Sequence, residues 1–157
     1  MSRRDHATVT ELDAYAVADE LVSAAVGAIT AKGFRVRIQP GLRNAIPLDA
    51  GGIGDAESVN VEVSYQLEFR GGGDGFGDMF DRTEPLYATV EAWWRTRGYA
   101  VVLRQLEPPF RALRARDPAS GFAVSLKQGR IGNLWLTVSS PPARATHTRP
   151  PPSTLLP

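Results

Sequence analysis

The residues best suited to chemistry lie in a glycine-rich segment, residues 71–81. It reads Gly-Gly-Gly-Asp-Gly-Phe-Gly-Asp-Met-Phe-Asp and carries three carboxylates, on Asp74, Asp78 and Asp81. Carboxylates and backbone carbonyls suit a hard cation such as calcium, although the spacing does not fit an EF-hand loop. The segment follows a predicted strand and precedes a predicted helix, where phosphate-binding loops occur. Asp78 stands where the dinucleotide pattern requires glycine, and no Lys-Ser or Lys-Thr follows, so neither phosphate-binding pattern is met.

The same segment carries three large apolar side chains, Phe76, Met79 and Phe80. Apolar side chains on a surface loop are typical of a loop that carries a binding function. Three interpretations stay open for the segment: a solvated loop, a cation site, or a loop that binds a partner through these three residues. Because nothing singles out a set of ligands, we expect no bound metal.

No set of residues in the chain makes a catalytic signature. The two histidines, His6 and His147, lie near opposite ends of the chain, and there is no cysteine. Ser139 and Ser140 therefore have no histidine base in a region that we expect to be ordered. No pair of acidic residues stands out as the acid and base of a hydrolase. We expect a protein without enzymatic activity or cofactor, with a metal-dependent enzyme built on the acidic loop as the third hypothesis.

Arginines and a tryptophan gather in the C-terminal part of the chain. The arginines that could form a basic patch there are Arg104, Arg111, Arg114, Arg116 and Arg130. Trp135 alternates with Leu134 and Leu136 and so belongs on the opposite face of its strand. Three readings are open for Trp135: a protein interface, partial burial, or stacking on single-stranded nucleic acid. The net charge of +1 makes a nucleic acid or an anionic membrane an unlikely partner.

A helix is predicted over residues 83–98, and the remaining elements must pack around it. Asp81 or Thr83 can cap its first turn, Pro85 suits that turn, and Gly98 can end the helix. Its apolar side chains recur at three- and four-residue steps: Leu86, Val90, Trp93 and Trp94. A pocket for a small ligand between these tryptophans, Trp94 among them, and the sheet is the alternative functional hypothesis.

The first helix is predicted from a capping box at Thr8 and Glu11 to a stop at Gly33. Its expected apolar stripe is Leu12, Tyr15, Val22, Val26 and Ile29, with Asp13, Asp19 and Glu20 off the stripe. A half-buried strand over 34–39 should close at Pro40-Gly41. The clearest alternation in the chain, residues 59–69, predicts a second strand whose Glu62 and Glu68 face Arg35 and Arg37 across the pair.

Strands are also predicted at 99–105, with Tyr99, Val101 and Leu103 inward, and as a hairpin of residues 122–126 and 134–138. The pattern favours an α+β fold, with an antiparallel or mixed sheet of about five strands and two helices packed on one face. We expect a loose N-terminal tail (1–8), one α+β domain (9–140) and a Pro-rich disordered tail (141–157). No signal peptide or membrane segment is apparent, so we expect a cytoplasmic protein.

Three stretches carry a resemblance to a known group of proteins. They are Trp94 with Arg97-Gly98-Tyr99, then Asp117 with Gly121 to Leu126, then Leu136 to Pro141. Residues 85–142 resemble the C-terminal half of small actinobacterial α+β proteins, many of which are lipoproteins. In those proteins the last strand often continues Ser-Ser-Pro-Cys, where this chain has Pro142. The resemblance implies a fold, and no catalytic residue or activity comes with it.

These observations lead to one functional hypothesis and its alternative. We expect a non-enzymatic interaction module, such as an adaptor, an immunity protein or an accessory subunit, that binds a protein partner. The residues expected at the binding site are Trp135, Phe76, Met79, Phe80 and Trp94. The alternative is the small-ligand domain with its pocket between helix 83–98 and the sheet.

Overall fold

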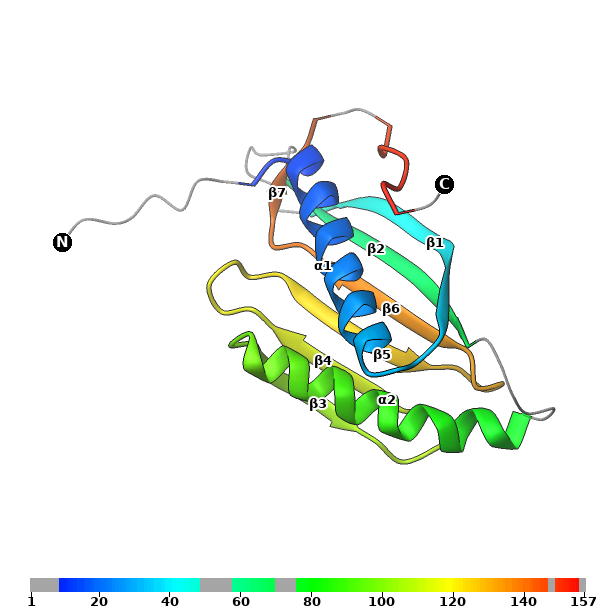
Figure 1. Cartoon of the computed structure of the whole chain (residues 1–157). Helices are drawn as coiled ribbons and strands as arrows, with labels where there is room; N and C mark the ends of the chain where they lie inside the picture. Colours follow the sequence, from blue (N-terminus) through cyan, green and yellow to red (C-terminus); the bar gives the residue numbers. More distant parts are fainter. Residues whose placement is uncertain (1–8, 49–57, 70–75, 147–148, 156–157) are drawn as a thin grey trace.

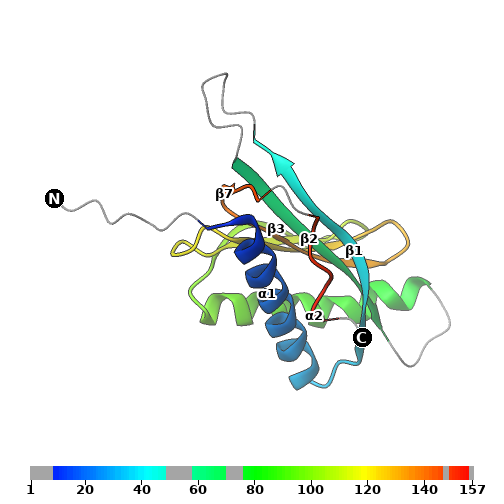
Figure 2. The same cartoon turned by 90° about the horizontal axis from the view of Figure 1, so that it is seen from above.

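The computed structural model describes residues 9–48, 58–69, 76–146 and 149–155, which form two helices and seven strands. In chain order these are α1 (Glu11–Ala31), β1 (Val36–Pro47), β2 (Ser58–Phe69), α2 (Phe76–Thr96), β3 (Ala100–Gln105), β4 (Ala112–Arg116), β5 (Ala123–Gln128), β6 (Leu134–Ser139) and β7 (Ala143–Arg144). The sheet has the order β1-β2-β6-β5-β4-β3, its neighbours are antiparallel, and β7 pairs with β2. Both helices lie on one side of the sheet (Figures 1 and 2). The predicted fold class is confirmed.

Helix α1 begins with Thr10 as its N-cap, and the Thr10 hydroxyl accepts a hydrogen bond from the Asp13 amide at 3.2 Å. The expected cap, Thr8, lies outside the described residues. Gly33, with φ of +91°, follows the helix as predicted, because glycine enters the left-handed region without strain. By length and hydropathy alone α1 could cross a membrane, but in this fold its buried side chains pack into the core.

The buried stripe of α1 differs from the predicted one at several positions. It runs along Tyr15, Ala18, Val22, Ala25 and Ile29. Leu12 is 45% exposed, whereas Asp19, expected outside the stripe, is only 3% exposed. Asp19 lies four residues after one stripe member and three before the next, so helical spacing placed it inward. Its burial is possible because other elements supply a charge partner and hydrogen-bond donors.

Helix α2 begins at Phe76, so the prediction of a loop up to residue 81 is wrong for residues 76–81. Pro85 consequently lies inside the helix, where it has no amide to bond the carbonyl of Asp81. Thr83 is no cap: it is fully buried, and its hydroxyl accepts hydrogen bonds from Arg111 Nη1 and Gln128 Nε2, both at 3.0 Å. Contacts from the sheet therefore hold the first half of α2 in place. Gly98, with φ of +82°, follows the helix as predicted.

Strand β1 is an edge strand that continues through Pro40 and Gly41, so the predicted stop there is wrong. A bulge between Pro40 and Arg43 accommodates the proline. An edge strand tolerates proline because only one of its two sides takes part in the hydrogen-bond ladder, so the missing N–H need not cost a bond. Arg37 faces Glu68 as predicted. Beyond the bulge, Glu62 faces Asn44 instead of an arginine.

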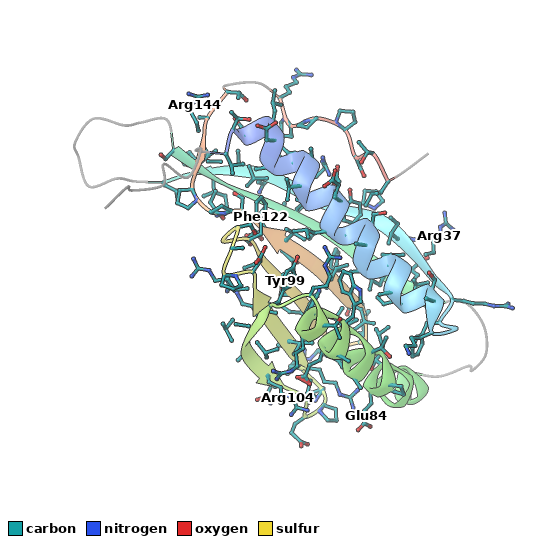
Figure 3. All side chains as sticks on the ribbon, turned by 60° about the vertical axis from the view of Figure 1, so that its left-hand side comes forward. Arg37, Glu84, Tyr99, Arg104, Phe122 and Arg144 are labelled. Atoms are coloured by element: carbon teal, nitrogen blue, oxygen red, sulfur yellow. The ribbon has the colours of Figure 1, made fainter. Side chains whose placement is uncertain are left out.

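A second bulge, between Val101 and Leu103, reverses which side chains of the remaining β3 residues point inward and which point outward. Leu103 was predicted to point inward but is 46% exposed. Arg104 takes the inward direction opposite Leu113, and its Nε lies 3.0 Å from both carboxylate oxygens of Glu91 on α2 (Figure 3). The alternation that predicted an inward Leu103 is therefore interrupted at the bulge, where β3 contains one residue more than its partner strand.

The expected disordered tail differs from the structure in its described residues, 141–146 and 149–155. β7 pairs with β2, and the Arg144 amide donates to the Val9 carbonyl at 2.9 Å. The amide and hydroxyl of Thr146 both donate to Glu11, at 2.7 and 2.9 Å. Residues 149–155 return to the domain beside α1 and β1 (Figure 1). Proline prevents regular pairing there, but it does not prevent side-chain contacts.

The close approach at the β1 bulge yields a stability test. A Cβ on Gly41 would lie 2.6 Å from the Ser64 carbonyl oxygen and 2.8 Å from its hydroxyl. We expect Gly41→Ala to lower the free energy of unfolding by about 1–3 kcal/mol, because backbone must shift. The matched control is Gly27→Ala on the exposed side of α1. A Cβ there would meet no atom within 4 Å apart from its chain neighbours and the adjacent helix backbone, and helix propensity predicts a gain of up to about 1 kcal/mol. Urea titration measures both, and equal effects would contradict the crowding argument.

Candidate interaction face

The side of the sheet that carries neither helix forms one continuous surface, which we call the outer face. Alternation and register assign the following residues to it: Glu62, Ser64, Gln66, Glu68, Leu103, Ala112, Arg114, Arg116, Ala123, Ser125, Lys127, Trp135, Thr137 and Ser139. The opposite positions of β2, β5 and β6 supply the buried core. Because the apolar side chains are used on the helix side, the outer face is rich in hydroxyl and cationic groups.

Trp135 lies on the central strand of the outer face. Its β6 register places it opposite Gln66 on one side and Lys127 on the other. Leu134 and Leu136 are buried while Trp135 is half-buried, as the predicted alternation requires. In the neighbouring row, Thr137 is flanked by two buried serines, Ser64 and Ser125. The indole thus lies among polar side chains and keeps part of its surface exposed.

The outer face is electrostatically uneven. Arg114, Arg116 and Lys127 are exposed on β4 and β5, and β4, β5 and β6 contain no carboxylate. Within the described residues, none of these three cations has an ion pair. The acidic side chains of this face, Glu62 and Glu68, stand on β2. Trp135 therefore lies between a cationic half and a mildly acidic half.

The expected five-arginine patch is divided by the fold. Arg104 turns toward α2 and pairs with Glu91. Arg111 is buried and donates to the Leu106 carbonyl and to Thr83. Arg130 is exposed in the turn between β5 and β6. Of the five, only Arg114 and Arg116 belong to the outer face, because Arg111 is buried, the β3 bulge directs Arg104 toward α2, and Arg130 lies in a turn.

The free edge of the sheet adds apolar surface next to the cations. Val102 and Leu103 on edge strand β3 are 58% and 46% exposed, and Leu103 stands opposite Arg114. Phe110 and Ile131 are also exposed, in the loops that follow β3 and β5. A sheet edge with exposed apolar side chains can pair with another extended chain.

The structure does not bring the five predicted site residues together. Trp135 is on the outer face, whereas Trp94 is 1% exposed in the core on the helix side. Phe76, Met79 and Phe80 belong to the first turns of α2, and their side chains lie outside the described part. Asp74, one of the three acidic residues of the glycine-rich segment 71–81, lies outside the described residues. Across the described residues, no group of three or more histidine, aspartate or glutamate side chains could hold a metal ion.

The inner side of α2, where the ligand pocket was expected, is closely packed. Leu86, Tyr87, Val90 and Trp94 are each at most 1% exposed. The Tyr87 hydroxyl donates to the Arg111 carbonyl at 3.1 Å. Burial raises the pKa of Tyr87 far above its ordinary value, because the phenolate would be poorly solvated there.

Sequence reasoning missed a polar cluster at Asp19, Arg43 and Tyr65. Arg43 and Asp19 form an ion pair at 2.7 Å, and the Tyr65 hydroxyl donates to Asp19 at 2.9 Å. Helical spacing could have found Asp19. No sequence pattern marked Arg43 as an inward residue, because its inward direction depends on the bulge at Gly41.

Comparison of the chain with protein-family models, with curated proteins and with solved structures found no significant match. The resemblance to small actinobacterial α+β proteins therefore stays a prediction.

Burial of Tyr87 predicts an alkaline loss of stability. In the unfolded chain Tyr87 loses its proton near pH 10, whereas the folded protein holds it protonated to higher pH. The contribution of protonated Tyr87 to the free energy of unfolding is fully present below about pH 10. Above that pH the free energy of unfolding falls by up to about 1.4 kcal/mol per pH unit. Urea titrations at several pH values should give a shallower decline for Tyr87→Phe, and parallel declines would contradict this assignment.

Proposed function

We propose that this protein is a non-enzymatic interaction module that binds the acidic surface of a protein partner on its outer face. The adaptor, immunity-protein and accessory-subunit roles all belong to this class. The observation that supports it is a half-buried Trp135 on a helix-free sheet face, beside three cations without ion pairs in the described residues.

The indole of Trp135 is the expected anchor of the interface. Trp135 is held on a β-strand, so it loses little side-chain entropy on binding and can bury a large apolar area. Tryptophan is enriched among the few residues that dominate binding energy, with losses of about 2 kcal/mol or more on truncation. The surrounding hydroxyl side chains, such as Thr137 and Ser139, can donate and accept hydrogen bonds at the rim.

Charge supports a partner that presents carboxylates. Arg114, Arg116 and Lys127 project from adjacent strands, so their fields add over the cationic half of the face. Such complementary charge raises the association rate and selects among partners more than it adds to affinity. Glu62 and Glu68 on the same face, together with the net charge of +1, favour a protein over the uniform negative charge of a nucleic acid.

The alternative of a small-ligand domain with a pocket under α2 has less support. The side chains on that side of the helix are buried against the sheet. A ligand there would have to displace packed side chains such as Trp94.

Partner recovery from the source cell, with the tagged full-length chain, tests the proposal. We expect one stoichiometric protein partner, identified by intact mass, and a loss of about thirtyfold in affinity for Trp135→Ala, the equivalent of 2 kcal/mol. The matched control is Leu12→Ala, an exposed apolar residue on α1. A partner retained equally by Trp135→Ala, or no stoichiometric partner, would contradict the proposal.

Charge reversal provides a second, independent readout on the same complex. Arg114→Glu should slow association by about tenfold or more at low salt, with a smaller effect at high salt, because screening removes long-range attraction. Lys32→Glu is the control, since Lys32 is exposed at the end of α1 on the helix side. Equal slowing by the two reversals would show that net charge, and not the outer face, guides the partner.

A further inference from the structure

The polar cluster between α1, β1 and β2 is built around a buried carboxylate. Asp19 receives two hydrogen bonds from the Arg43 guanidinium, at 2.7 and 3.2 Å, and one from the Tyr65 hydroxyl at 2.9 Å. The guanidinium also lies 5.3 Å from the centroid of the Tyr15 ring. Two aromatic rings and a fixed ion pair thus meet at one site.

The C-terminal segment, residues 150–155 (Pro-Pro-Pro-Ser-Thr-Leu), lies beside α1 and β1 (Figures 1 and 2) and contacts this cluster. The Pro151 carbonyl accepts a hydrogen bond from Arg43 Nε at 3.0 Å. Ser153 hydrogen-bonds the Tyr65 hydroxyl. The amide and hydroxyl of Thr154 donate to Asp19 at 3.5 and 3.4 Å, and Leu155 packs partly buried against the core.

This arrangement has the chemistry of proline-rich peptide recognition. An extended proline run has free carbonyls and little conformational entropy to lose, and aromatic side chains with a fixed donor recognise it. Here Arg43 donates to a proline carbonyl, and Tyr65 and Asp19 bind the hydroxyl side chains that follow the prolines. The prolines have no amide with which to extend the β1 edge, so side chains make most of the contacts.

The C-terminal segment fits the site imperfectly. The Tyr15 hydroxyl is buried and has no hydrogen-bond partner within the described part of the chain. Both Thr154 contacts with Asp19 are at the long end of hydrogen-bond distances. A peptide that shortens the bonds to Asp19 would therefore bind better than the segment itself.

We propose that Asp19, Arg43, Tyr65 and Tyr15 form a docking site for an extended proline-rich peptide of a partner protein, one that carries serine or threonine hydroxyls. Residues 150–155 occupy the site as a built-in competitor. A tethered competitor acts at an effective concentration on the order of millimolar, so it keeps weak ligands out and sets a threshold for the partner. This site is separate from the outer face, and the two proposals stand independently.

The test uses the full-length chain and a fluorescent peptide with the sequence of residues 149–157 as the probe. Substituting Ser153, Thr154 and Leu155 by alanine removes three contacts of the built-in segment and leaves the docking site intact. We expect the anisotropy titration to give about tenfold or tighter binding for this variant than for the unmodified chain, because the cis competitor is weakened. A probe with its prolines replaced by alanine should bind more weakly.

Matched substitutions then locate the probe. In the triple-alanine background, Tyr65→Phe removes only the hydroxyl that contacts Asp19, Arg43 and the serine of the segment, and should weaken probe binding by about fivefold or more. Tyr87→Phe makes the same change at a buried tyrosine under α2, and Trp135→Ala alters the outer face; both should leave probe binding unchanged. No tightening in the triple-alanine variant, or equal effects of the two tyrosine substitutions, would overturn the proposal. If the unmodified chain formed dimers by exchanging this segment, the ligand of the site would be a second copy of the chain. That result would overturn the proposal of a partner peptide.

Discussion

The structure depends on one constraint: the apolar side of an antiparallel sheet must be covered, and two helices cover it. Strands β2, β5 and β6 send Val, Leu and Tyr side chains to one side, where α1 and α2 remove them from water. Small residues on α1, Ala14, Ala18 and Ala25, allow that helix to approach β2 closely. Because the helices cover only one side, the side chains on the other are mostly polar or charged, apart from Trp135 and Leu103.

Buried polar groups determine where each helix lies along the sheet. Asp19 ties α1 to β1 and β2 through Arg43 and Tyr65, and Thr83 ties α2 to the sheet through Arg111 and Gln128. Apolar contacts alone would tolerate sliding of a helix, whereas an unpaired buried charge or hydroxyl is costly. The Gln128 Oε1 atom and the Tyr15 hydroxyl are the buried side-chain atoms without a partner in the described residues.

The two proposed binding regions use opposite sides of the molecule and different chemistry. The outer face offers one aromatic anchor on rigid strands and cations spread over β4 and β5, which suits a folded partner. The cluster at Asp19 offers a fixed ion pair and two tyrosines, which suits an extended peptide. A protein with both could hold a folded partner and a proline-rich segment together, with the C-terminal residues 150–155 controlling the second contact.

Local order was predictable from the chain itself. The left-handed glycines Gly33 and Gly98, the alternation of 59–69 and the period of α1 each depend on neighbouring residues, and together they indicated the α+β fold and the outward Trp135. Tertiary structure decided the rest: the bulges that turned Arg43 and Arg104 inward, the burial of Asp19, the helical start at Phe76 and the return of the C-terminal segment. The physical reason is that these features depend on partners distant in sequence, since Arg43 bonds a carboxylate 24 residues before it and a carbonyl 108 residues after it. A periodic pattern can show which face of an element is apolar, but only the packed fold determines which polar residue finds a partner inside.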